Sequence, residues 1–324
     1  MKRIVSLFLV SLVLISTIFA SGAEEKQTAA YPNKTIQMVV PYGAGGGADI
    51  SIRLLTKYLE KELGQKFVVQ NVSGGSGTIG FTQLANAKPD GYTLGYFSST
   101  QSNDSLLFEG ITYGDTSFTP ISLFASDPHI VIASKASGIT TMQDLIDAAK
   151  KNPGGLTFGL GGAWTSHDFL RMNLENVAGV EFKRMVFQGG AAAVTAVAGN
   201  NCSVAVPFVS EALAQIEAGN VVPIAISSAN RSDLASSIPT IKESGFDFEH
   251  TMWRALVGPA GLSAEVVSTI DGAMAKVMAN PEFLAEAKAA GVFTEYMDTK
   301  DFSVFYEENH QLYKKLIENA LLEK

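Results

Sequence analysis

Cysteine is almost absent from this chain of 324 residues, which has a single thiol at Cys202. A lone thiol has no partner for an internal disulfide, so a small cross-linked fold is excluded. The chain also lacks low-complexity tracts, and 46% of its residues are hydrophobic. Stability must therefore come from a hydrophobic core, in which Cys202 is expected to be a small buried member. The length is sufficient for two ordinary domains.

Positive charge is also scarce. The chain has 24 lysines and arginines against 32 aspartates and glutamates, a formal net charge of −8, and no basic run. Nucleic-acid binding relies on clustered cations that neutralise phosphates, so we expect no nucleic acid as a partner. The four histidines are too widely spaced for a zinc-ligand motif, so neither a metal nor another cofactor is predicted. These are His129, His167, His250 and His310.

The N-terminus has the pattern of a leader sequence. Lys2 and Arg3 precede an uncharged run from Ile4 to Phe19, and small residues follow at 20–23. This pattern predicts a secretory signal peptide over residues 1–22. The alternative, a retained membrane anchor, is disfavoured because the run is shorter than the roughly 20 residues that span a bilayer. No cysteine near the cleavage region offers a site for a lipid, so we expect a free secreted protein.

Two glycine-rich segments follow short apolar runs. Residues 36–40 predict a strand and residues 50–63 a helix, with the sequence PYGAGGGAD at 41–49 between them. A second predicted strand, 67–69, precedes SGGSGTIG at 73–80 and another helical stretch. Free N–H groups and the helix dipole favour an anion at such junctions. In a parallel sheet both loops lie on one rim, where we expect the ligand.

The predicted ligand contacts of the first half lie in these loops and in a third one after a strand at 93–97. They are Tyr42, Gly43, Ala44, Gly45, Gly46, Gly47, Ser73, Gly74, Gly75, Ser76, Ser98 and Thr100. We expect Asp49 to cap the helix and to pair with Arg53, because its carboxylate would repel an anion.

The second half repeats the order of strand, loop and helix. Strands are predicted at 156–160, 182–187 and 202–208, each followed by a loop or turn and a helix. Capping pairs are predicted at Thr140 with Gln143 and at Thr165 with Asp168. The candidate ligand contacts of this half are Thr165, Ser166, His167, Gly189 and Pro207.

This order predicts two α/β lobes joined by two crossovers. Lobe 1 is assigned to 31–123 and 252–324, and lobe 2 to 124–251. The helical segments 264–278, 281–290 and 301–322 are expected to pack on lobe 1. Arg171, Arg184 and Arg254 are candidate carboxylate clamps, although an exposed helix or strand end is the commoner place for an arginine.

The sequence resembles the solute receptors of tripartite tricarboxylate transporters, the Bug-type proteins, over nearly the whole secreted part. The matching features are Tyr31-Pro32, the loop 41–49, Asn71, Gly74, Gly77, Ile79, Gly80, PDGYTL at 89–94, Ser166-His167, Gly189, Gly199 and the segment 253–261. The resemblance implies a type II periplasmic binding-protein fold that closes on a small organic acid anion and delivers it to a membrane permease. It also implies a periplasmic monomer without catalytic activity.

Several residues depart from the family pattern. Ala48 stands where many members have Thr, and Ser76 where Gly is common. Ser203 and Pro207 stand where many relatives have acidic residues. Fewer acids would suit a more negative ligand, which favours a dicarboxylate or a tricarboxylate.

The leading alternative is a secreted Rossmann-like dinucleotide-binding oxidoreductase. The sequence GSGTIG at 75–80 satisfies the pattern G-x-G-x-x-G after a predicted strand. The acidic residue expected about 20 positions downstream is missing, because Ser98, Ser99 and Thr100 occupy that region. The Walker A, G-x-S-x-G and S-x-x-K patterns of other enzyme classes are absent too. We therefore expect a receptor and not an enzyme.

Overall fold

The computed structural model describes residues 30–45, 47–99, 101–231 and 236–322. The predicted signal peptide at 1–22 and the candidate contacts Gly46 and Thr100 lie outside the described residues. Lys34–Lys324 form one compact unit, and the elements below belong to it.

The first sheet has six strands in the order β11-β4-β10-β3-β1-β2. Its strands are β1 (Ile36–Val40), β2 (Phe67–Asn71), β3 (Thr93–Ser98), β4 (Phe118–Pro128), β10 (Thr251–Pro259) and β11 (Thr294–Met297). Strand β1 pairs in parallel with β2 and β3, whereas β10 is antiparallel to β3 and β4. The carboxyl ends of β1, β2 and β3 therefore meet at one rim, as the sequence predicts.

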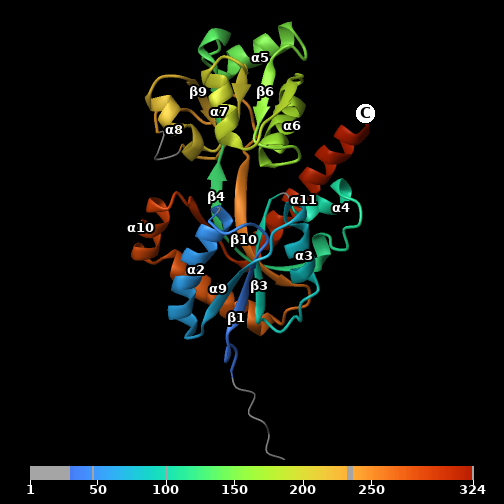
Figure 1. The fold of residues 1–324 in the computed structure, drawn as a ribbon, viewed down its shortest axis with the longest axis vertical. Coiled ribbons are helices and arrows are strands. Elements are labelled where there is room, and N and C mark those ends of the chain that lie inside the picture. The colour runs from blue at the N-terminus through green and yellow to red at the C-terminus, as the bar shows by residue number, and fades with distance from the viewer. Residues whose placement is uncertain (1–29, 46, 100, 232–235, 323–324) are drawn as a thin grey trace, which may run out of the picture. The chain divides into compact units, whose positions relative to one another are not determined.

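The helices of this lobe come from both ends of the chain (Figure 1). They are α2 (Gly47–Leu63), α3 (Thr78–Ala85), α4 (Asp104–Leu107), α9 (Ala264–Met278), α10 (Pro281–Ala289) and α11 (Thr299–Leu322). Short 3₁₀ turns are η1 (Gly75–Gly77), η2 (Gln101–Asn103) and η3 (Asp115–Ser117). Phe81, Phe97 and Trp253 are central members of the aromatic core that β3, β10, α3 and α11 enclose.

The second sheet has five strands in the order β7-β6-β8-β5-β9. Its strands are β5 (Ile130–Ala133), β6 (Thr157–Leu160), β7 (Lys183–Val186), β8 (Val204–Ala205) and β9 (Val222–Ile226), and its helices are η4 (Lys135–Ser137), α5 (Met142–Lys151), α6 (Ser166–Ala178), α7 (Gly190–Ala198) and α8 (Val209–Glu217). Val131 and Ala133 pack against α5 and α6, while Ile130 and Ile132 pack against α7 and α8. This alternation along β5 shows that both faces of the sheet are covered.

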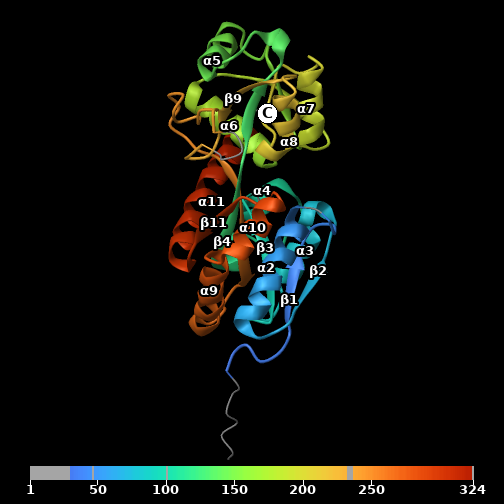
Figure 2. The same cartoon turned by 90° about the vertical axis from the view of Figure 1, so that its left-hand side faces the viewer.

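Two strands of the first sheet lead to and from the second sheet, and they pair with each other (Figures 1 and 2). Strand β4 reaches Pro128 and is followed by β5, and β10 begins at Thr251 after the segment that follows β9. The lobe boundary assigned at 123/124 therefore falls inside β4, and that at 251/252 falls at the start of β10.

Three local predictions need correction. The cap of α5 is Thr141 with Asp144, and not Thr140 with Gln143, because the Thr140 hydroxyl donates to the Asp144 carboxylate. The strand predicted over 202–208 is reduced to β8. Helix α11 packs on β4 as expected, but its last turns also contact α6 of the second lobe.

Candidate functional site

The first glycine loop leaves β1 with an exposed main chain at Gly43, Ala44 and Gly45, and α2 begins at Gly47. The N–H of Gly45 donates to Asp49 Oδ2 at 2.8 Å. Gly45 has a φ of 80°, a conformation that glycine adopts without strain. The loop therefore closes on the first turn of its own helix.

Asp49 supports this loop as predicted. Its carboxylate is buried and also accepts from Arg53 Nε at 2.9 Å and from Asn71 Nδ2 at 3.0 Å. Burial alone would raise the pKa of Asp49, but the hydrogen bonds from Arg53, Gly45 and Asn71 hold it below its usual value. Asp49 is consequently an anion that is already satisfied and has a structural role.

Tyr42 turns its ring into the first lobe. The ring makes edge contacts with Phe81 and Tyr96, whose centroids lie at 6.4 and 5.9 Å. Its carbonyl accepts from Asn71 Nδ2 at 3.0 Å, so one amide side chain binds both Tyr42 and Asp49. Burial raises the pKa of the Tyr42 hydroxyl, which therefore stays protonated.

The second glycine loop lies against the first. Ser73, Gly74, Gly75 and Ser76 are exposed, and Ser76 has a φ of 58°, in the left-handed region. A Cβ atom on Gly77 would lie 3.3 Å from Tyr42 Cε1, and one on Gly80 would lie 2.8 Å from both Pro41 Cα and Val72 O. The missing side chains of Gly77 and Gly80 thus allow the two loops to touch.

The third loop differs from the first two. Ser98 is the last residue of β3, and its side chain is buried with its hydroxyl donating to Gln101 Oε1. In this structure the Ser98 hydroxyl is therefore bound within its own loop.

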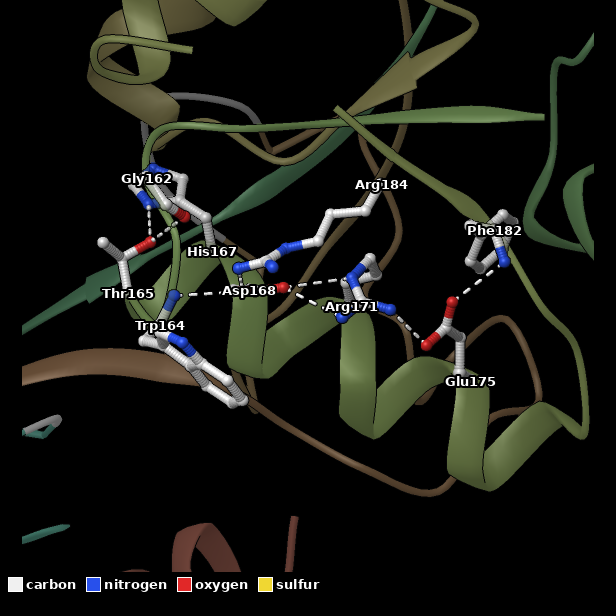
Figure 3. Close-up of polar contacts among 9 residues, drawn as sticks. All are labelled: Gly162, Trp164, Thr165, His167, Asp168, Arg171, Glu175, Phe182 and Arg184. Atoms are coloured by element: carbon white, nitrogen blue, oxygen red, sulfur yellow. Dashed lines mark hydrogen bonds and ion pairs between the residues drawn. The ribbon is translucent and has the colours of Figure 1, made fainter. Parts of the chain in front are cut away.

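In the second lobe, Asp168 organises the loop before α6 (Figure 3). Its buried carboxylate accepts from Trp164 N at 3.0 Å and from Arg171 Nη2 at 2.9 Å, and it also pairs with Arg184. The predicted pairing of Thr165 with Asp168 is wrong, because the Thr165 hydroxyl donates instead to Gly162 O at 3.0 Å.

The three candidate arginine clamps are all engaged with acids. Arg171 bridges Asp168 and Glu175, and Arg184 pairs with Asp168 while lying 5.7 Å from the centroid of the Trp164 ring. Arg254 is buried and pairs with Asp127, so the expectation of an exposed strand end is wrong for it. Its position in the middle of β10, between β3 and β4, explains the burial.

Three loops of the second lobe meet at Gly161. Gly189 N donates to Gly161 O at 3.1 Å, and a Cβ on Gly161 would lie 3.0 Å from His167 Cε1. Glu211 Oε2 lies 4.0 Å from His167 Nε2 and accepts from Phe208 N at 2.9 Å. The candidates His167 and Gly189 are thus neighbours. Pro207 is buried beside the connection from β4 to β5, where its carbonyl accepts from Ile130 N.

A cluster of three histidines is the feature that sequence spacing missed. The ring centroid of His129 lies 5.0 Å from that of His167 and 5.3 Å from that of His250. His129 follows β4 and His250 precedes β10, so both belong to the crossovers. Their proximity could have been found only by placing both next to the predicted crossovers, because they are far apart in the sequence.

Two of these histidines, His129 and His250, are held electrically neutral. Burial lowers the pKa of His250 to about 3 and that of His129 well below its ordinary value. A hydrogen bond of 3.1 Å joins His250 Nε2 to Ser166 Oγ at the start of α6. Among the residues that the structure describes, no cluster of histidine, cysteine and acidic side chains is arranged to hold a metal ion.

A cavity of about 240 Å³ lies beside the first glycine loop. Gly47 and Ile50 line it from α2, Phe208 and Ser210 from the start of α8, and the Asp127–Arg254 pair from the crossovers. A larger cavity of about 760 Å³ is lined by His250, Trp253, Asn309, Tyr313 and neighbours, and none of the predicted ligand contacts lines it.

Comparison with known proteins gives the family. The sequence model of the tripartite tricarboxylate transporter family receptor matches residues 51–322. The chain belongs to this receptor family. The predicted Bug-type resemblance is thereby confirmed. Receptors of this family are periplasmic solute-binding proteins.

The similarity between this chain and its relatives extends over most of the length of both proteins. BugT of Bordetella pertussis is 28% identical over 275 residues, which are 84% of each protein. A TctC solute-binding protein from Polaromonas superposes with a TM-score of 0.80 at 27% identity, over 90% of this chain and 100% of that one. The R. palustris protein Rpa4515, solved with adipate, gives 0.72 at 25% identity, over 90% and 98%.

These structural matches confirm the predicted α/β fold of periplasmic binding proteins for this tripartite tricarboxylate receptor. Among its described residues, no helix combines the length and the apolar character that crossing a bilayer requires.

Proposed function

We propose that this receptor captures a small dicarboxylate or tricarboxylate in the periplasm and delivers it to the permease of a tripartite tricarboxylate transporter. The leader at 1–22 would direct its secretion, and it would act as a monomer without catalysis or a cofactor. The anion would bind to the loops at 42–47, 73–76 and 98–100 of one lobe and to 165–167, 189 and 207 of the other.

One observation carries the proposal: Gly43 and Ala44 are exposed just before the N-terminus of α2, beside the exposed loop at 73–76, whereas the N–H of Gly45 is already bound to Asp49. Such a surface offers amide N–H groups and the positive end of a helix dipole to an anion. The side chains of Arg171, Arg184 and Arg254 are bound to acids, so we assign the ligand to backbone amides, hydroxyl groups and the His167 ring, whose Nε2 has no hydrogen-bond partner among the described residues. Adipate in the related Rpa4515 agrees with this chemistry.

The expected affinity follows from these donors. Each hydrogen bond to a charged group contributes roughly 1.5 to 3 kcal/mol net. Three or four such bonds, reduced by the cost of association, correspond to a Kd near the micromolar range, or about −8 kcal/mol.

A thermal-shift experiment tests the function. Adipate, malonate and citrate are compared with sucrose, putrescine and NADH on the secreted form of the protein. We expect at least one acid to raise the melting temperature, because a ligand that binds only the folded state stabilises it. A response to NADH alone would favour the oxidoreductase, and a response to sugar or amine alone would refute the carboxylate receptor.

A matched pair of glycine variants tests the site. Neither Gly43 nor Gly114 has an atom within 4 Å of an added Cβ, and neither has a positive φ. Gly43→Val should leave the melting temperature unchanged but weaken acid binding at least about tenfold, since the branched side chain occupies the space of the ligand. Gly114→Val should change neither. Equal binding by the wild type and Gly43→Val in calorimetry would remove the first loop from the site.

A further inference from the structure

The chain returns from the second lobe to the first through the segment 250–254, at the start of β10, which we call the return crossover. One of its side chains contacts the first turn of α2, the helix that follows the first glycine loop. Arg254 Nη1 donates to Gly47 O at 2.7 Å and lies 3.4 Å from Ser51 Oγ. The same guanidinium pairs with Asp127, the penultimate residue of β4. The charge of Arg254 is thus balanced inside the protein, and its donors hold the point at which the first glycine loop becomes α2.

The same crossover makes a corresponding contact in the second lobe. His250 immediately precedes β10, and its Nε2 lies 3.1 Å from Ser166 Oγ in the first turn of α6. Its backbone is fixed as well, because His250 N donates to Ser227 O at 2.8 Å and Ser227 N donates to His129 O at 3.0 Å. The imidazole is buried, so this hydrogen bond is shielded from water.

We propose that Arg254 and His250 are positioning residues through which the return crossover holds one ligand loop in each lobe. This inference rests on the proposed function for the identity of the loops. Arg254 fixes the entry to α2, and His250 fixes the entry to α6. Both side chains belong to one short segment, so a movement of the crossover displaces the two loops together. Ligand binding to the loop of one lobe is thereby coupled to the conformation of the loop in the other lobe.

Hydrogen exchange tests the positioning without any ligand. Arg254→Gln is combined with Asp127→Asn, because removing the arginine alone would leave a buried unpaired carboxylate. His250→Leu keeps the volume but loses Nε2, and His250→Gln restores a polar nitrogen near that place. Thr251→Val is the control, since the Thr251 hydroxyl accepts from Ser126 Oγ across the crossovers, at 2.7 Å, and lies in neither ligand loop.

We expect the Arg254→Gln/Asp127→Asn protein to exchange the amides at 51–54, the first in α2 with carbonyl acceptors inside the helix, about tenfold faster, the effect of losing a hydrogen bond to a charged group. His250→Leu should accelerate exchange at 166–170, His250→Gln should restore slow exchange, and Thr251→Val should alter neither segment. Unchanged exchange in both segments, in variants that remain folded by circular dichroism, would overturn the positioning role.

Calorimetry with the acid that gives the largest thermal shift then tests the coupling. Each positioning variant should bind this acid about tenfold more weakly, and the effects of the two should be non-additive when combined. If the wild type binds the acid but the variants do not weaken binding, or their effects on the binding free energy are additive, the coupling is refuted. If the wild type binds no acid, the proposed function fails, while the exchange result still decides whether Arg254 and His250 position these helices.

Discussion

Two buried aspartates perform the same task in the two lobes. Asp49 lies in the first turn of α2 and accepts from Gly45 N at 2.8 Å, and Asp168 lies in the first turn of α6 and accepts from Trp164 N at 3.0 Å. Each also pairs with an arginine on its own helix. A carboxylate in this position closes the preceding loop on the helix and is stabilised by the helix dipole. The anion ligand must therefore use other donors.

The buried cluster around Asp168 predicts a large stability effect. Asp168→Leu removes the acceptor of Trp164 N and leaves Arg184 without its carboxylate, so unfolding in urea should show a loss of about 3 kcal/mol. The control is Lys276→Gln, which removes a long and exposed pair with Glu62 and should cost less than about 1 kcal/mol. Equal midpoints for the two variants would contradict this role of Asp168.

The neutral state of His250 predicts a pH dependence of stability. Its pKa of about 3 in the folded protein lies below the ordinary value of 6.5, so the folded state binds fewer protons than the unfolded state between these values. The stabilisation is fully present above pH 6.5 and is lost as pH falls towards 3, by about 1.4 kcal/mol per pH unit.

Asp104 acts in the opposite direction, because burial raises its pKa to about 7, and it therefore stabilises the folded state as pH falls towards 3.8. The effect of His250 is isolated by comparing the wild type with His250→Gln in urea from pH 7.5 to 5. The stability advantage of the wild type should shrink with falling pH. A constant difference across this range would show that His250 is not held neutral.

At the scale of elements, the sequence predicts the backbone best where composition dictates it. The glycine loops between β1 and α2 and between β2 and α3 are predictable because an apolar run, glycines and a helical period follow one another there. A side chain with several possible partners is not predictable, as with the Thr165 hydroxyl, which donates to Gly162 O. Contacts between distant segments, such as the histidine cluster and the pair of Arg254 with Asp127, leave no local pattern in the sequence.

The close contact between the two glycine loops predicts that a single methyl group added at Gly80 lowers the stability of the protein. A Cβ on Gly80 would lie 2.8 Å from Pro41 Cα and Val72 O, which are parts of the two loops. Gly80→Ala should therefore separate the loops and lower stability by about 1 to 3 kcal/mol.

The control for this prediction is Gly272→Ala on α9, where no atom lies within 4 Å of the added Cβ and the position is exposed. This change should raise stability by about 0.5 to 1 kcal/mol, because alanine is the better helix former. Both changes are read from thermal unfolding. If Gly80→Ala leaves the melting temperature unchanged, the stability of the protein does not depend on the close packing of the two loops.

At the scale of the whole molecule, the two α/β lobes were predictable because each repeats strand, loop and helix with its own hydrophobic faces. The structure adds a link that periodicity could not reveal. Phe169 and Met172 of α6 pack with Tyr313, Leu316 and Ile317 of α11. A helical repeat shows that a face is apolar but does not show which partner covers it, so the sequence predicts packing of α11 on the first lobe and not its contact with α6.

This aromatic link predicts how cooperatively the protein unfolds. The rings of Phe169 and Tyr313 are stacked with centroids 4.3 Å apart, and the other cores of the described residues belong to one lobe each, except that Phe293 of the first lobe packs against a core of the second. Tyr313→Ala should cost about 3 kcal/mol or more through the cavity it creates, and it should split the calorimetric transition into two, because each lobe can then melt separately. Leu312→Ala, on an exposed face of the same helix, should keep a single transition. If Tyr313→Ala merely lowers the temperature of one sharp transition, the crossovers alone are sufficient to make the lobes unfold together.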